Sequence, residues 1–261
     1  MTYEIRLATA KDLSAVLQWL KEEEDAYNDG VSIERGFYCN RNVVSDAQEN
    51  NALFVALDGD HPIAFAALSS AMDEINILEV QPGRRREGAG RTLATHCIEH
   101  YRNAGNGACV VTVECTPETS EPFWKSLGFK LFPPRFQTGG ALGIYEIEHR
   151  YENHPDWEPV EVVIRVFRER ALYERENVIP PIMEIRPNAA RDGDGAIQLG
   201  KRIIFYRDLL GFEPREDVAI ELIINGESKF KEKAKYDISR DYGVQFCNRS
   251  GAHFLETIPG D

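Results

Sequence analysis

The run from Val80 to Gly90, VQPGRRREGAG, constrains the fold of this chain more than any other segment. It follows an apolar, strand-like stretch, Glu74–Val80, and precedes Thr92–Tyr101, where apolar residues recur at helical spacing. Glycines let the main chain approach a ligand closely, and the start of a helix presents unpaired N–H groups and a positive dipole end. The sequence therefore predicts a strand–turn–helix unit that binds an anionic, phosphate-bearing ligand.

Within this run, the spacing Arg85-x-x-Gly88-x-Gly90 resembles the acyl-CoA pyrophosphate signature of the GNAT superfamily of N-acetyltransferases. The stretch Phe123–Phe129, FWKSLGF, resembles the superfamily's later motif, in which an aromatic pair, three residues and Gly-Phe close a helix and start a strand. A buried-looking strand, Ala108–Cys115, stands between the two motifs. Short glycine patterns occur by chance, but two motifs in the expected order and spacing indicate the family.

The resemblance implies an α/β fold for residues 1–148, with a mixed, mostly antiparallel central sheet flanked by helices. Because 261 residues exceed one typical domain, we expect a linker at 149–159 and a second, smaller, β-rich domain at 160–261. In that second domain Asn225-Gly226 is a strong hairpin signal. The alternation over Lys229–Tyr236 predicts a returning strand with one cationic face.

The N-terminal region carries two predicted helices. Thr9 and Asp12 have the spacing of a capping box, which predicts a helix that begins there and runs to about Ala26. A second helix is predicted from Ser32 to about Asp46. In members of the superfamily the corresponding pair of helices borders the acceptor site.

The resemblance implies acetyl-CoA as cosubstrate, bound by the end of the Glu74–Val80 strand and by the turn and helix start that follow. No metal site is expected, because the five cysteines are scattered without the spacing of metal ligands. The cofactor-binding residues predicted in this way are Val80, Arg85, Arg86, Gly88, Ala89, Gly90, Arg91 and Thr92.

Two glutamates are the predicted catalytic residues. Glu74 stands at the start of its strand, where several protein-lysine acetyltransferases of the superfamily place a glutamate that accepts the proton of the amine. Glu79 is the second candidate, and Glu114 is a rival to both. A carboxylate that acts as a base near neutral pH needs a pKa raised by burial.

Trp124 stands where the superfamily commonly has a tyrosine that protonates the departing thiolate. An indole N–H is far too weak an acid for this step, so we expect Trp124 to pack against the cofactor or the core. Tyr145, on the predicted closing strand, is the alternative proton donor, although a core position is the other interpretation. Water is a third source of the proton.

The charge balance, with 30 Lys and Arg against 43 Asp and Glu, argues against a general nucleic-acid binder and suits a cationic acceptor. We therefore predict an N-acetyltransferase that moves an acetyl group from acetyl-CoA to a primary amine of a small molecule or a protein. The second domain then recognises the acceptor or builds a homodimer. The sequence has neither a span-length apolar run nor a secretory signal pattern, so a cytoplasmic protein with no membrane partner is expected.

Two other functions remain open from the sequence. One is a non-catalytic CoA-binding regulatory or scaffold protein whose C-terminal β domain binds a partner, which Trp124 and the unassigned base motivate. In the other, residues 160–258 are the functional half, and the transferase fold is a scaffold.

Overall fold

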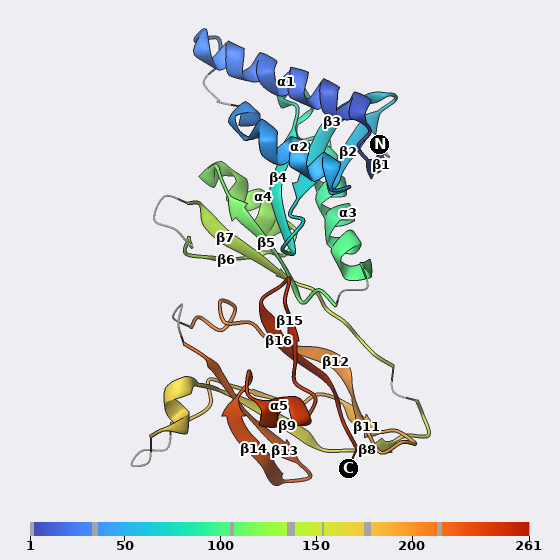
Figure 1. Cartoon of the computed structure of the whole chain (residues 1–261), viewed down its shortest axis with the longest axis vertical. Coiled ribbons are helices and arrows are strands. Elements are labelled where there is room, and N and C mark those ends of the chain that lie inside the picture. The colour runs from blue at the N-terminus through green and yellow to red at the C-terminus, as the bar shows by residue number, and fades with distance from the viewer. Residues whose placement is uncertain are drawn as a thin grey trace. The chain divides into compact units, whose positions relative to one another are not determined.

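The computed structural model of the protein describes residues 3–32, 36–104, 107–134, 139–152, 154–174, 179–212 and 216–260. The chain folds into two compact units, residues 1–146 and 147–261 (Figure 1).

The first unit is built on one seven-stranded sheet, with the order β1-β2-β3-β4-β5-β7-β6. Every neighbouring pair is antiparallel except β4 and β5. Its strands are β1 (Glu4–Leu7), β2 (Leu53–Asp58), β3 (His61–Leu68), β4 (Glu74–Val80), β5 (Val110–Cys115), β6 (Lys130–Phe132) and β7 (Ala141–Glu146). Its helices are α1 (Ala10–Asn28), α2 (Arg41–Glu49), α3 (Ala89–Asn103) and α4 (Glu121–Ser126), with short 3-10 turns η1 (Phe37–Asn40), η2 (Pro82–Arg84) and η3 (Glu118–Ser120). This confirms the predicted mixed, mostly antiparallel α/β fold.

Helices cover the sheet on both faces (Figure 1). Val16 and Leu20 of α1 and Val44 of α2 are fully buried in one core with Phe65 of β3. Phe54 of β2 points to the opposite face, where its ring lies 5.0 Å from the rings of both His96 and His100 of α3. The two layers hold the central strands between them.

The second predicted helix differs from the structure. The helix α2 begins at Arg41, after η1, whereas the sequence predicts a start at Ser32; residues 33–35 of that prediction lie outside the described chain. A Cβ on Gly36 would lie 2.8 Å from Oε2 of Glu23 in α1. The chain therefore passes close against α1 at a glycine before the helix can begin, and this tertiary contact leaves no periodic signal in the sequence.

The strands β4 and β5 are hydrogen-bonded neighbours only at their beginnings. Two pairs form, Glu74 with Thr112 and Ile75 with Val113, and the pairing then ends. On its other edge β4 stays paired with β3 as far as Val80, opposite Ala64. Beyond Ile75, the edge of β4 that begins beside β5 therefore has no strand partner in the described chain.

A β-bulge lies at the same point of β4. Ile77 pairs with Ala67 of β3 and Ile75 with Leu68, so Asn76 is an extra residue with no partner position on β3. The bulge is the first residue of β4 past the last pair with β5.

The second unit consists of two antiparallel sheets, with the orders β10-β9-β13-β14 and β15-β16-β12-β11-β8. Ile164 and Leu222 from the first sheet and Leu199 and Leu255 from the second are almost fully buried in one shared core. The elements are β8 (Glu158–Pro159), β9 (Val162–Arg168), η4 (Glu169–Leu172), β10 (Met183–Ile185), β11 (Ala189–Arg191), β12 (Ile197–Phe205), β13 (Val218–Ile224), β14 (Glu227–Lys233), α5 (Asp237–Asp241), β15 (Gln245–Cys247) and β16 (Ala252–Ile258). The unit is rich in β structure, as the sequence predicts.

Two details of this unit bear on the sequence predictions. The strand β8 lies inside the stretch 149–159 predicted as a linker and pairs with β11, and the predicted domain boundaries stay predictions. The predicted cationic face of β14 is interrupted, because the side chain of Lys233 is only 8% exposed and forms ion pairs with Glu169 and Asp217.

Among the described helices of both units, none combines the length and apolarity that a membrane crossing requires.

The predicted capping box at the start of α1 is confirmed. The Thr9 hydroxyl accepts from the Asp12 N–H, and the Asp12 carboxylate accepts from the Thr9 N–H at 2.8 Å and from Nη1 of Arg6 at 2.6 Å. Burial acts to raise the pKa of Asp12, but the hydrogen bonds from Arg6 and Thr9 outweigh it and lower the pKa to about 2.

A lowered pKa means that Asp12 stabilises the fold above its ordinary pKa of 3.8 and loses this contribution as the pH falls toward about 2. We expect the wild type to lose about 2 kcal/mol of unfolding free energy over that window relative to Asp12→Asn. Chemical denaturation across the window measures this difference. Asp25→Asn, which removes an exposed carboxylate from the same helix, is the control, and equal pH profiles for the two variants would contradict the assignment.

Candidate functional site

The predicted strand–turn–helix unit is present, and its main chain bends sharply between β4 and α3. Arg86 has φ of +68° and Gly88 has φ of +95°, both in the left-handed region. A Cβ placed on Gly88 would have no atom within 4 Å, so space is open beside this residue. Gly88 is the N-cap of α3, and the helix therefore begins next to that open space.

The first turn of α3 offers unused amides. Its first hydrogen bond runs from the Thr92 N–H to the Gly88 carbonyl, at 3.0 Å. The helix itself therefore does not use the N–H groups of Ala89, Gly90 and Arg91. A Cβ on Gly90 would lie 3.0 Å from Cγ2 of Val80, so the glycine allows the helix start to pack closely on the end of β4. Such amides, together with the positive end of a helix dipole, are the groups that hold anions at helix N-termini.

The three arginines of the turn, Arg84, Arg85 and Arg86, differ in the hydrogen bonds and ion pairs that they form. Arg85 donates from Nε to the Val80 carbonyl at 3.2 Å and from Nη2 to Oε1 of Glu79 at 3.1 Å. Arg84 forms ion pairs with Asp58 and Glu87. Two of the three arginines are therefore held by groups of the protein itself.

The third arginine of the turn, Arg86, and Arg91 of α3 lie on either side of the helix start in the sequence. Arg86 is exposed, and no residue of the described chain accepts a hydrogen bond from it or pairs with it. Arg91 donates to the carbonyl and the hydroxyl of Ser126, at 3.3 and 2.7 Å, and so joins α3 to the end of α4. Arg86 is thus the cation most available to an anion at the helix start.

Glu79 is a buried carboxylate beside a cation. Its side chain is 11% exposed, and it accepts from Arg85 and from the Val80 N–H, the latter at 3.1 Å. Burial raises the pKa of Glu79 and nearby Glu23 adds to this, while Arg85 and the Val80 amide partly counteract it. A raised pKa is the property that a carboxylate base needs near neutral pH.

Glu74 and Glu114 occupy different settings. Glu74 is partly exposed at the start of β4, and its carbonyl accepts from the Tyr101 hydroxyl at 2.7 Å. Five residues of strand separate Glu74 from Glu79, which is roughly 16 Å at the rise of an extended chain. The structure therefore does not bring the two predicted catalytic residues together. Glu114 is exposed on β5 and accepts from the Gly140 N–H and the Thr116 hydroxyl.

Trp124 packs in an aromatic cluster, as expected from the sequence. It is 6% exposed, and its ring centroid lies 4.9 Å from that of Phe123 and 5.1 Å from that of Phe129. The ring of Tyr145 lies 5.4 Å from that of Phe129. The cluster fixes α4 on β6 and β7, and it leaves Trp124 with a packing role.

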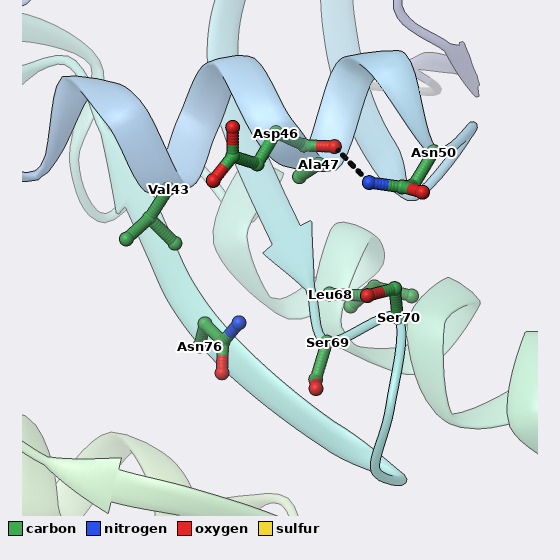
Figure 2. A pocket seen from close by; sticks show the side chains of 8 residues that line it. All are labelled: Val43, Asp46, Ala47, Asn50, Leu68, Ser69, Ser70 and Asn76. Carbon is green, nitrogen blue, oxygen red and sulfur yellow. Dashed lines mark hydrogen bonds between the residues drawn. The ribbon is translucent and has the colours of Figure 1, made fainter.

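A cavity of about 210 Å³ lies between α2 and the β3–β4 connection. Asp46 projects from α2 and Asn76 from β4, and Figure 2 shows their side chains facing one another across it. Sequence reasoning missed both residues, because a single Asp on a helix and a single Asn in a strand carry no motif. The complete lining is Val43, Asp46, Ala47, Asn50, Leu68, Ser69, Ser70 and Asn76.

Metal ligation has no support in the described residues, which contain no group of three or more His, Cys, Asp or Glu placed to hold an ion. The thiol of Cys115 is buried at the end of β5, and burial raises its pKa to about 11. Such a thiol is not a ready nucleophile near neutral pH.

Residues 34–144 match the family model described as an acetyltransferase (GNAT) domain. The first unit therefore contains a GNAT acetyltransferase domain, which confirms the resemblance of the two motifs, and the match ends before the second unit begins. Among curated proteins, none matches this chain in sequence.

Several solved structures are similar to the first part of the chain. The PaiA N-acetyltransferase from Thermoplasma acidophilum in complex with coenzyme A is 16% identical, with 56% of this chain and 100% of that chain covered and a TM-score of 0.45. Arylalkylamine N-acetyltransferase 2 from Aedes aegypti is 14% identical, with 56% and 100% covered and a TM-score of 0.43. A GNAT-family acetyltransferase from Bacillus cereus is 12% identical, with 56% and 98% covered and a TM-score of 0.42.

The buried carboxylate gives a test that needs no ligand. Because the pKa of Glu79 is raised in the folded protein, the wild type loses stability as the pH rises past the ordinary glutamate value of 4.5 and through the raised value. Glu79→Gln has no such group, so its unfolding free energy should increase relative to the wild type over that range. Denaturation curves measured on both sides of the range give the difference.

Glu49→Gln, which removes an exposed carboxylate from α2, is the matched control for loss of one negative charge. A stability difference between Glu79→Gln and the wild type that stays constant or falls with pH would show that Arg85 and the Val80 amide, and not burial, dominate at Glu79.

Proposed function

We propose that the chain is an acetyl-CoA-dependent N-acetyltransferase, which moves an acetyl group to a primary amine by direct attack. The observation that carries the proposal is the divergence of β4 from β5, directly followed by the open N-terminus of α3. The unpaired edge of β4 is followed along the chain by the start of α3, where the first amides are not used by the helix. Together they suit a ligand that is extended at one end and polyanionic at the other.

The strand edge suits the amide-bearing arm of such a ligand. In an antiparallel ladder the hydrogen-bonding residues alternate, and the Gln81 N–H bonds to the Ile63 carbonyl of β3 at 2.9 Å. By this alternation the main-chain groups of Leu78 and Val80 point away from β3, toward the gap. An extended chain can add to such an edge as a strand does. The sequence predicts Val80 in this role and not Leu78, whose assignment follows from the register with β3.

The helix start suits the pyrophosphate. The amides of Ala89, Gly90 and Arg91 and the cation of Arg86 supply donors and positive charge there. Arg85 would join them by leaving Glu79 and the Val80 carbonyl. When bound, acetyl-CoA supplies the activated acetyl group as a thioester.

The reaction needs a neutral amine and a base for its proton. The amine forms a C–N bond as the C–S bond breaks, and the surplus proton of the amine passes to a base. Glu79 has the raised pKa that suits this role, whereas Glu74 has the position, next to the point where β4 and β5 separate. We propose both as candidates, and the tests below separate them. Water is the proposed source of the proton for the thiolate.

The first test is binding of acetyl-CoA and of CoA by titration calorimetry. Gly88→Glu should abolish binding, because its side chain brings bulk and negative charge to the helix start. Gly59→Glu in the β2–β3 turn is the matched control, because it adds the same side chain at a φ of +58°, also in the left-handed region. The control should bind as the wild type does.

Absence of acetyl-CoA binding by the folded wild type would overturn the proposed function. Binding lost equally in Gly59→Glu would mean that the loss reflects backbone strain and not the anion site.

The second test concerns the base. Removal of a general base typically lowers turnover by about 10²–10⁴-fold, so Glu74→Gln or Glu79→Gln should lower kcat by that order. Acetyl-CoA affinity should change little in Glu74→Gln, whereas Glu79→Gln also releases Arg85 from its ion pair. CoA release with a panel of primary amines gives kcat, and calorimetry gives the affinity. Replacement of the base should also abolish the corresponding ionisation in the pH profile of kcat.

If both variants keep wild-type kcat, neither glutamate is the base. If the protein binds acetyl-CoA and releases no CoA with any amine, the non-catalytic CoA-binding function is supported instead. We propose separately that residues 160–261 recognise the acceptor or build a homodimer. Deleting these residues would not by itself distinguish the two roles.

A further inference from the structure

The cavity between α2 and the β3–β4 connection is the most specific feature that the proposed function has not used. It adjoins the strand divergence, because Asn76 belongs to both. As the bulged residue of β4, Asn76 is the first past the last pair with β5, while its side chain lines the cavity (Figure 2). A molecule in this cavity is therefore next to the point at which the partnerless edge of β4 begins.

The lining of the cavity selects for a cation. It contains one carboxylate, Asp46, and no Lys, Arg or His. Within the described part of the chain, neither the Asp46 carboxylate nor the Asn76 side-chain amide has a hydrogen-bond partner. The bond drawn at Asp46 in Figure 2 is made by its main-chain carbonyl, which accepts from Nδ2 of Asn50 at 2.7 Å. The carboxylate thus remains available to a ligand.

The same lining suits an alkyl chain between polar ends. Val43 contributes partly exposed apolar surface, and Ala47 and Leu68 lie buried beside it. A short aliphatic chain can lie on Val43 while its terminal group reaches Asp46.

The chemistry of the reaction then decides how many amino groups the acceptor has. The side chain of Asp46 is exposed, so it lacks the burial that makes a carboxylate a base near neutral pH, and an amine paired with it stays an ammonium ion with no lone pair to attack a thioester. The group at Asp46 is therefore not the group that is acetylated. The attacking amine has to be a second amino group of the same molecule, and it must lie toward Asn76 and the strand divergence.

We propose that the cavity binds the non-reacting ammonium group of an aliphatic diamine, with Asp46 as its ion-pair partner and Asn76 directing the second amino group toward the strand divergence. This inference rests on the proposed acetyl transfer and names the acceptor class for it.

The test compares 1,4-diaminobutane with n-butylamine, which keeps the alkyl chain but lacks the second amino group. Calorimetric titration of each amine into the free protein measures binding, and CoA release from acetyl-CoA measures transfer. We expect kcat/KM for the diamine to exceed that for butylamine by at least tenfold. Butylamine should compete with the diamine, because its ammonium group also fits Asp46.

Asp46→Asn should weaken diamine binding and raise its KM by about tenfold or more, because an ion-paired hydrogen bond becomes a neutral one. The hydrogen bond from Asn50 is kept, because it uses the main chain of residue 46. Glu49→Gln is the matched control: it removes one negative charge from the same helix, outside the cavity lining, and should leave both values unchanged. Affinity for acetyl-CoA should be the same in all three proteins.

If the diamine binds, two results would overturn the proposal: equal effects of Asp46→Asn and Glu49→Gln, or butylamine acetylated as well as the diamine. Failure of the proposed function is distinct, because it is a failure to bind acetyl-CoA or to release CoA with any amine. In that case diamine binding that is lost in Asp46→Asn would still establish the site. An acetyl-CoA-binding protein that acetylates other amines and does not bind the diamine would remove this proposal alone.

Discussion

The early end of the β4–β5 pairing is the constraint on which the functional architecture depends. Backbone N–H and C=O groups need partners, and a strand in the middle of a sheet normally finds them on both sides. Here β4 has a full partner in β3 and only two paired residues on β5, Glu74 with Thr112 and Ile75 with Val113. The helices α1, α2 and α3 pack against the sheet and hold the strands in place. The gap is therefore a fixed part of the fold.

Arg85 shows how the protein satisfies this open edge without a ligand. Its guanidinium donates to the Val80 carbonyl and to Glu79, so one side chain serves both a main-chain acceptor and a buried carboxylate. A ligand that attracted Arg85 would have to break these contacts. It would then also leave Glu79 with less positive charge beside it, and the pKa of Glu79 would rise further. The proposed anion site and the carboxylate would thus be coupled through one arginine.

How much of the molecule the sequence predicts depends on how local each interaction is. The capping box of Thr9 and the strand–turn–helix unit are each formed by residues that are close in the sequence, so both were predicted correctly. The ion pairs of the buried Lys233 reach Glu169 in η4 and Asp217 just before β13, both distant in sequence, and alternation alone assigned that lysine to a continuous cationic face. The cavity at Asp46 depends on a register shift in β4, which requires the pairing with β3 to be known. Motifs thus predicted the strand–turn–helix unit, and only the fold shows the cavity that lies beside β4.

The bulge in β4 also adds one residue to this strand without disturbing the layers on the two faces of the sheet. In a regular strand Ile75 and Ile77 would share a face, but the extra residue between them gives them adjacent partners on β3. Ile77 joins the core beneath α1 and α2, whereas Ile75, equally buried, does not belong to that cluster. Removal of Asn76 would leave a regular ladder in which Ile75 still pairs with Leu68 and Ile77 with Ala67, so both isoleucines would keep their layers. The bulge therefore adds the Asn76 side chain to the cavity without changing which residues of β4 enter the core.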